Sequence, residues 1–129
     1  MIRIGIVDDK GINRSTIRQS LLTEKDLHIV LEASNGEDFL GQLQNLNNAE
    51  HPQIVLMDLD MPVMGGIETI AVATVRYPDI RFIVLTIFDD DEKIFEAIKA
   101  GAAGYLLKDD SATQIREAIH NVLDHNGAP

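Results

Sequence analysis

Residues 53–66 read QIVLMDLDMPVMGG, a stretch that predicts a buried strand ending on a carboxylate. The four apolar residues 54–57 lie between Pro52 and a loop that contains Pro62 and two glycines. A short apolar run bounded in this way favours a core strand of a parallel sheet over a helix. Ligands of open α/β sheets bind at the carboxyl ends of the strands, so Asp58 occupies a position suited to function.

The composition is that of a globular domain with an acidic balance. A length of 129 residues suits one domain with one core, and 45% hydrophobic with 25% charged residues excludes a disordered chain. The net charge of -10 argues against DNA binding by these residues alone, and the absence of cysteine excludes a thiolate nucleophile. No apolar run reaches membrane-spanning length, and the first residues enter a strand pattern at once. We therefore expect a cytoplasmic protein without membrane contact.

The rest of the chain alternates between strand and helix patterns. Further strands are expected at residues 2–7, 27–33, 80–86 and 103–107. Helices are expected at residues 11–22, 37–46, 66–76, 89–100 and 112–125, with Ser34-Asn35-Gly36 and Ser111 as caps. This alternation predicts an α/β fold, a flavodoxin-like doubly wound sheet of five parallel strands in the order 2-1-3-4-5, with five helices on its two faces.

Residue spacing also predicts which side chains are buried. In the first helix, helical spacing is expected to put the apolar residues Ile12, Ile17, Leu21 and Leu22 on one face, with Arg14, Arg18 and Gln19 on the other. The four histidines, which show no metal-ligand spacing, are interpreted as surface or helix-end residues.

Polar side chains follow four neighbouring strands of this predicted sheet. They are Asp8, Asp9, Asp58, Thr86 and Lys108. Two carboxylates at about 4 Å repel each other by roughly 4 kcal/mol at an effective dielectric constant near 20, so three of them require a cation. An all-oxygen site with room for water suits Mg²⁺.

This combination of groups predicts phosphoryl chemistry. The Asp58 carboxylate can act as a nucleophile and form an aspartyl phosphate. The divalent cation and Lys108 would neutralise charge on the oxygens of the transferred group.

The motifs together resemble the receiver domain of two-component response regulators. They are Asp8-Asp9, Asp58 with Met61-Pro62 and Gly65-Gly66 behind it, Thr86, and GYLLK at residues 104–108. The resemblance covers essentially the whole chain and is greatest to the NarL-type subfamily. It implies a receiver domain at residues 1–125, with 126–129 beginning a linker to an output domain outside this chain.

The resemblance implies a metal and a phosphoryl donor for the site. Asp58 would accept a phosphoryl group from a sensor histidine kinase and would share Mg²⁺ with its neighbours. Asp9 would bind the ion directly, Asp8 through water, and Asp60 through its backbone carbonyl.

The resemblance also implies a switch. Thr86 would hydrogen-bond the bound phosphoryl group, and Lys108 would pair with another of its oxygens. The inward movement of Thr86 would draw in the aromatic ring of Tyr105 and change the surface. A phosphorylation-dependent homodimer is a candidate assembly, and transcription through a DNA-binding output domain is the expected result.

Three positions depart from the family pattern. Gly65 stands where an acidic residue is common, and Asp109 stands where many receivers have a proline after a cis bond. Ile87 is bulkier than the usual residue. We expect Ile87 and Phe88 to screen the phosphoryl group from water and slow its hydrolysis.

Two other functions stay open on the sequence. An aspartate-nucleophile phosphatase would use Asp60, two residues after Asp58, as its acid/base, but the chain leaves no room for a cap domain. A degenerate receiver would act only as an interaction domain, against which the complete set of site residues argues. The switch, in contrast, would be no enzyme toward outside substrates and would assist only its own phosphorylation and dephosphorylation.

Overall fold

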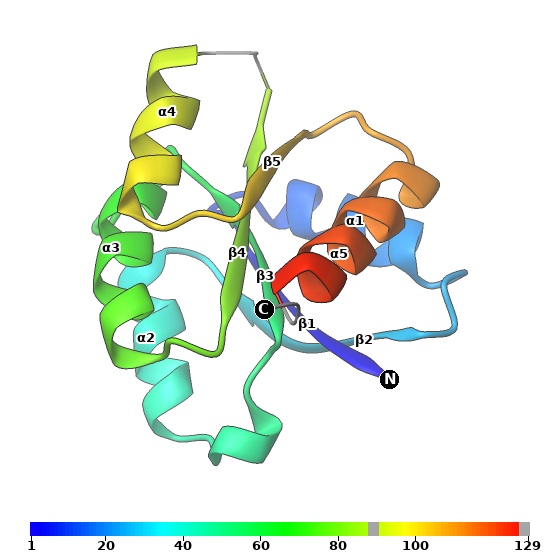
Figure 1. Ribbon diagram of the computed structural model, residues 1–129, viewed down its shortest axis with the longest axis horizontal. Helices are drawn as coiled ribbons and strands as arrows, with labels where there is room; N and C mark the ends of the chain where they lie inside the picture. Colours follow the sequence, from blue (N-terminus) through cyan, green and yellow to red (C-terminus); the bar gives the residue numbers. More distant parts are fainter. Residues whose placement is uncertain (88–90, 127–129) are drawn as a thin grey trace.

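The computed structural model describes residues 1–87 and 91–126, which form one five-stranded sheet with helices on both faces (Figure 1). The strands are β1 (Ile2–Val7), β2 (Leu27–Ala33), β3 (Ile54–Asp58), β4 (Arg81–Thr86) and β5 (Gly104–Leu107). The helices are α1 (Gly11–Leu21), α2 (Gly36–Gln44), α3 (Gly66–Arg76), α4 (Asp91–Ala100) and α5 (Ala112–Asn126).

The sheet has the predicted topology. Its order is β2-β1-β3-β4-β5, and each neighbouring pair is parallel. The flavodoxin-like fold class is therefore confirmed. The predicted start of a helix at Asp89 lies outside the described residues, and α4 is seen from Asp91 onward.

Strand β3 runs through the centre of the sheet and separates two hydrophobic cores. Val55 and Met57 pack toward α2, α3 and α4, whereas Ile54 and Leu56 pack toward α1 and α5 (Figure 1). Successive side chains of a strand point to opposite faces, and both faces here are covered by helices. This is why the strand reads as an unbroken apolar run, with all five residues buried.

Local capping signals in the sequence are confirmed. The Asn35 side chain accepts a hydrogen bond from the backbone N–H of Asp38 at 2.8 Å and caps α2. Before α5, the Ser111 hydroxyl accepts from the Gln114 N–H at 3.2 Å, and the Gln114 side chain accepts from the Ser111 N–H at 2.8 Å. This reciprocal pair is a capping box.

A short 3₁₀ helix, η1 (Asn48–Glu50), was not predicted. It carries its own capping box, in which the Glu50 side chain accepts a hydrogen bond from the Asn47 N–H at 3.0 Å. The spacing of asparagine and glutamate three residues apart was the available sequence signal.

The apolar face predicted for the first helix is wrong at two positions. Ile12 and Leu22, expected beside Ile17 and Leu21, are exposed. In α1 the buried residues are Ile17 and Leu21, one turn apart. Ile12 precedes Ile17 by five positions, a rotation of about 140°, so the two side chains cannot face the sheet together.

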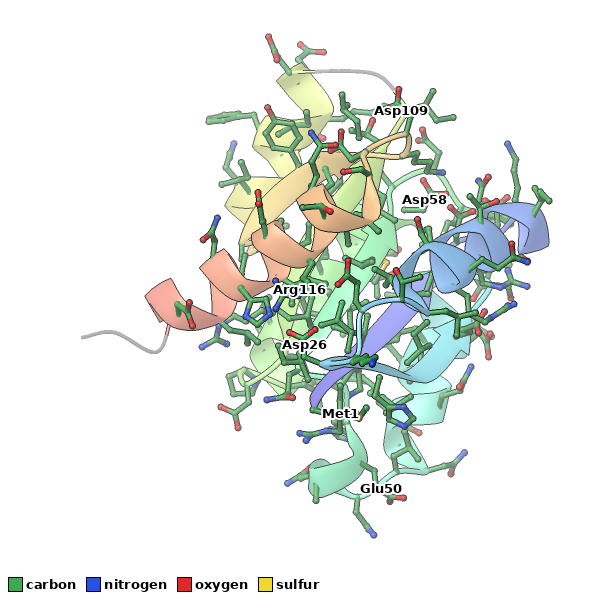
Figure 2. All side chains as sticks on the ribbon, turned by 90° about the vertical axis from the view of Figure 1, so that its right-hand side faces the viewer. Met1, Asp26, Glu50, Asp58, Asp109 and Arg116 are labelled. Carbon is green, nitrogen blue, oxygen red and sulfur yellow. The ribbon has the colours of Figure 1, made fainter. Side chains whose placement is uncertain are left out.

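The last helix is tied to the loop before β2 by charged side chains (Figure 2). The Arg116 guanidinium donates two hydrogen bonds of 3.1 Å to the Asp26 carboxylate, and His120 Nε2 lies 2.6 Å from the same group. These hydrogen bonds hold the pKa of Asp26 down at about 2. Within residues 1–87 and 91–126, no helix has the length and apolar character needed to cross a membrane.

Candidate functional site

The carboxyl ends of the central strands bring the predicted site residues together. A cleft of about 190 Å³ at this edge of the sheet is lined by residues that include Asp9, Asp58, Asp60, Thr86 and Lys108. In Figure 2, Asp58 and Asp109 mark this end of the molecule, and Met1 and Glu50 mark the other. Asp8 does not line the cleft but clusters with Asp9 and Asp58, so the structure brings together all five residues that the strand pattern predicted.

Lys108 joins two buried carboxylates. Its Nζ lies 3.0 Å from Oδ2 of Asp8 and 3.1 Å from Oδ1 of Asp58. Burial lowers the pKa of the Lys108 ammonium, but the hydrogen bond to Asp8 and the charge of Asp58 outweigh this effect and raise the pKa above its ordinary value. The lysine therefore stays protonated and is shared between two negative charges.

Asp8 is fully buried and is held by a set of donors that the sequence analysis missed. Besides Lys108, the backbone N–H of Lys10 donates to Asp8 Oδ1 at 2.9 Å, and Asn13 Nδ2 lies 3.3 Å from both carboxylate oxygens. Arg14 donates to the Asp8 carbonyl oxygen at 2.6 Å. A buried carboxylate needs such partners, so polar residues in the first turn of α1 were the available signal.

Asp58 lies in an environment that disfavours its charge. Burial, together with the negative charges of Asp8 and Asp9, raises its pKa from 3.8 to about 6 against the opposing effect of Lys108. A carboxylate with this pKa is more basic than an ordinary aspartate and is still mostly ionised at neutral pH. The site is thus left with uncompensated negative charge.

The donor set fits a hard divalent cation. One carboxylate oxygen from each of Asp8, Asp9 and Asp58 lies within 4.8 Å of the others. Oxygen-only ligands with open positions for water suit Mg²⁺. Among the described residues, the carboxylate of Asp60 is not part of this cluster; it is 79% exposed and lies 2.9 Å from Lys93 Nζ.

Close packing requires glycine at Gly66, after Asp58, and at Gly36, at the start of α2. A Cβ on Gly66 would lie 2.2 Å from the carbonyl oxygen of Asp58, and one on Gly36 would lie 1.8 Å from Oγ1 of Thr69. The N–H of Gly36 donates to the Met64 carbonyl at 3.0 Å, so the start of α2 supports the loop that follows Asp58.

The same loop contains a strained residue. Val63 has φ of 70°, a left-handed conformation that is unfavourable for a β-branched side chain. Its side chain is exposed, so packing does not require valine at this position.

Thr86 and Tyr105 lie on neighbouring strands and on the same face of the sheet. Thr86 pairs with Leu107 and Val84 pairs with Tyr105 in the parallel register. Since side chains alternate along a strand, residues two apart share a face. The Tyr105 side chain is 46% exposed and Thr86 is half-buried at the end of β4.

Two of the departures from the family pattern can be located. Ile87 lines the cleft and is 59% exposed, while Phe88 lies outside the described residues, so the proposed wall against water stays a prediction. The peptide bond between Lys108 and Asp109 is trans, as is every peptide bond in the described part of the chain.

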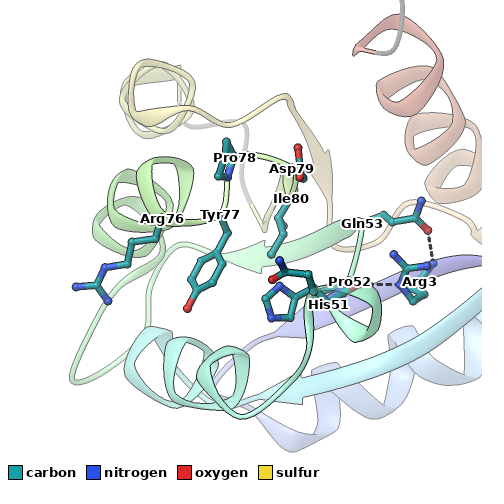
Figure 3. Close-up of a pocket in the computed structure, with 10 residues that line it drawn as sticks. Arg3, His51, Pro52, Gln53, Arg76, Tyr77, Pro78, Asp79 and Ile80 are labelled. Carbon is teal, nitrogen blue, oxygen red and sulfur yellow. Dashed lines mark hydrogen bonds between the residues drawn. The ribbon is translucent and has the colours of Figure 1, made fainter.

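Of the two positions expected for the histidines, His51 has the helix-end one, since it follows η1 as its C-cap residue, but it is not at the surface. His51 is only 7% exposed, its Nε2 lies 3.0 Å from the carbonyl oxygen of Leu43, and its ring meets Tyr77 edge-on at 5.3 Å (Figure 3). Arg3 donates to the His51 carbonyl at 2.8 Å. Arg3, His51 and Tyr77 line a separate cavity of about 150 Å³ at the amino ends of the strands, the opposite edge of the sheet from Asp58.

The sequence is similar to curated bacterial transcriptional regulators. It is 39% identical to the transcriptional regulatory protein LnrK of Bacillus subtilis over 98% of this chain and 55% of that protein. It is 33% identical to the nitrate/nitrite response regulator NarL of Escherichia coli K12 over 89% of this chain and 51% of that protein. The chain therefore spans about half the length of these relatives.

Solved receiver structures share the fold. The signal receiver domain of the putative response regulator NarL from Mycobacterium tuberculosis superposes with a TM-score of 0.83 at 28% identity, over 93% of this chain and 94% of that one. A LuxR-family two-component response regulator from Aurantimonas sp. SI85-9A1 gives 0.84 at 28% identity, over 95% of this chain and 85% of that one.

These similarities confirm the resemblance inferred from the motifs and give no support to the phosphatase alternative. The relatives are response regulators rather than enzymes of metabolism. Residues 4–120 match the response regulator receiver domain, and the chain belongs to that family.

Proposed function

We propose that this domain is a phosphorylation-controlled switch in which Asp58 accepts a phosphoryl group from a sensor histidine kinase. The observation that carries the proposal is the placement of Asp58 in a cleft, 3.1 Å from Lys108 and clustered with two further carboxylates. This arrangement puts a nucleophile beside the charges that phosphoryl transfer requires.

In the transfer step, an oxygen of Asp58 forms a bond to phosphorus while the bond between phosphorus and the donor nitrogen breaks. The raised pKa of Asp58 supports this role, because a more basic carboxylate is a better nucleophile and is still ionised at neutral pH. After the transfer, the Lys108 ammonium, which had paired with the Asp58 carboxylate, also interacts with an oxygen of the phosphoryl group.

Magnesium fits the donor set and would be held by Asp8, Asp9 and Asp58, with the Asp60 backbone carbonyl as a further ligand. When bound, the ion neutralises negative charge on the phosphoryl oxygens. The donors around Asp8 orient the buried part of the metal site, since they fix both of its carboxylate oxygens.

The readout of phosphorylation is a movement of Thr86 and Tyr105. Thr86 hydrogen-bonds the phosphoryl group, and Tyr105 fills the space that it leaves. Their placement on one face of β4 and β5 supports this coupling. The exposed Tyr105 side chain would become more buried, which changes the surface beside α4.

The output is transcription, controlled through a DNA-binding domain outside this chain. The support is that the matched relatives are transcriptional regulators of about twice this length. In this proposal residues 126–129 begin the linker, although 127–129 lie outside the described residues. The domain works in the cytoplasm, acts on no outside substrate, and forms a homodimer when phosphorylated.

The test is phosphorylation by acetyl phosphate, followed by intact mass. Wild type should gain one phosphoryl group with Mg²⁺ present and none with EDTA. Asp58→Asn should gain none, whereas Asp60→Asn should still be labelled, because its carboxylate is exposed and outside the metal cluster.

Labelling of Asp58→Asn at the wild-type rate would overturn the assignment of the acceptor. Labelling of wild type that is equal with Mg²⁺ and with EDTA would overturn the role of the metal. A parallel assay with para-nitrophenyl phosphate checks for turnover of an outside phosphoester, and steady release of nitrophenol would contradict the switch.

A further inference from the structure

An ion pair crosses the mouth of the phosphorylation cleft. Lys93 Nζ lies 2.9 Å from Oδ1 and 3.2 Å from Oδ2 of Asp60. Lys93 belongs to the first turn of α4, and Asp60 belongs to the loop that follows β3. Both residues line the same cleft as Asp58, so the pair lies at the route by which a phosphodonor reaches the nucleophile.

We infer that Lys93 is a specificity-determining residue for the phosphodonor: its ammonium neutralises Asp60 and thereby sets how readily an anionic donor enters the cleft. The inference rests on the proposed function of Asp58. It adds a residue from α4 that neither the sequence motifs nor the metal cluster indicated.

The cleft contains several negative charges that would repel an anionic phosphodonor, so neutralisation of one of them should affect the rate at which the donor enters. Asp8, Asp9 and Asp58 cluster there, and Lys108 is already engaged by two of them. Asp60 adds another carboxylate close by, and every phosphodonor is an anion. Like charges raise the barrier to entry, and charged groups around a cleft change association rates by about 10-fold or more. Lys93 offsets the charge of the outermost carboxylate.

A second role for the same pair would be mechanical, because it joins α4 to the loop that carries the nucleophile. The two roles predict different signs. If the pair acts by charge, removing the cation slows phosphorylation and removing the anion accelerates it. If the pair acts as a tie, both changes break the same contact and shift the rate in the same direction.

The experiment compares Lys93→Gln, Asp60→Asn and the double variant with wild type. Asp60→Asn retains the backbone carbonyl that the metal site would use. Lys99→Gln is the matched control, because Lys99 lies on the same helix but stacks over Phe95 with its Nζ 5.3 Å from the ring centroid. Rates of adduct formation with acetyl phosphate are measured at saturating Mg²⁺ and at low and high salt.

At low salt we expect Lys93→Gln to be about 3- to 10-fold slower than wild type and Asp60→Asn to be faster by a similar factor. The double variant should return close to wild type, and Lys99→Gln should not differ from it. High salt should shrink every difference, because exposed charges are screened. Phosphoramidate carries less negative charge than acetyl phosphate. With phosphoramidate as the donor, the rates of the variants should therefore differ less from the wild-type rate.

Rates of adduct formation that change in the same direction in Lys93→Gln and Asp60→Asn would overturn the inference in favour of the mechanical role. Equal rates in all variants, or an equal effect of Lys99→Gln, would overturn it as well. Adduct formation by wild type tests the proposed function, and the ratio of variant to wild-type rates tests this inference. The two failures are therefore distinguishable. Absence of any adduct in wild type overturns both, whereas labelled wild type with unchanged ratios overturns only the role of Lys93.

Discussion

Replacing Asp58 should stabilise the folded domain. Asp58 is 6% exposed, and its carboxylate faces those of Asp8 and Asp9, with Lys108 as the compensating cation. We predict that Asp58→Asn, which removes the charge and nearly preserves the shape, raises the free energy of unfolding at neutral pH without Mg²⁺. Functional sites often retain such unfavourable groups.

The size of the effect follows from the pKa of Asp58. Its pKa rises from 3.8 to about 6 on folding, so the folded state binds the proton more tightly than the unfolded state. Ionisation therefore costs folding free energy above pH 6 and costs nothing below the unfolded pKa. A rise of the pKa from 3.8 to about 6 corresponds to about 3 kcal/mol. Because an amide does not reproduce every contact of a protonated carboxyl, we expect a gain of about 1–3 kcal/mol.

The assay is urea unfolding followed by circular dichroism in EDTA, at neutral pH and at pH about 5 and below, where the difference should shrink. Added Mg²⁺ should stabilise wild type more than the variant, because only the wild type retains the full set of carboxylates. The difference in free energy of unfolding between Asp58→Asn and wild type should therefore narrow or change sign when Mg²⁺ is added.

A variant no more stable than wild type in EDTA would refute the reasoning that burial and carboxylate repulsion act on Asp58. A gain that is constant across the pH range would also refute it, since a titrating charge must produce a pH-dependent difference.

Four further predictions concern the surroundings of the site, each measured by urea unfolding. Gly36→Ala should destabilise the domain by about 1–3 kcal/mol, because the added Cβ would collide with α3. Gly41→Ala in the same helix is the control: its Cβ would meet no described atom within 4 Å, and it should stabilise the domain by about 0.5–1 kcal/mol. Val63→Asn should stabilise by about 1 kcal/mol by relieving the left-handed strain, and Val63→Ile should not. Lys108→Met should destabilise by on the order of 3 kcal/mol, and less at low pH, where Asp58 takes up a proton. Asp26→Asn should be less stable than wild type at neutral pH, and the difference in free energy of unfolding should disappear as pH falls from 3.8 toward 2. A difference that persists at that pH would contradict the stabilisation of the fold by the charge of Asp26.

The sequence by itself determined the fold class and the location of the site. Strand β3 is buried on both faces, so its apolar run and its terminal Asp58 were readable without knowledge of any contact. The same holds for the polar residues at the ends of the other central strands, because parallel strands place their carboxyl ends at one edge. The caps at Asn35 and Ser111 were also readable, since a capping bond spans only three residues.

Only the tertiary structure decided the contacts between distant segments. The burial of His51 depends on Leu43 and Tyr77, and the exposure of Ile12 depends on which arc of α1 meets the sheet. The pairing of Lys93 with Asp60 joins residues 33 positions apart. Periodicity states which residues share a face, but it does not state what lies opposite that face. The partner is set by the packing of whole helices on the sheet, and so are the charge around the cleft and the pKa of Asp58.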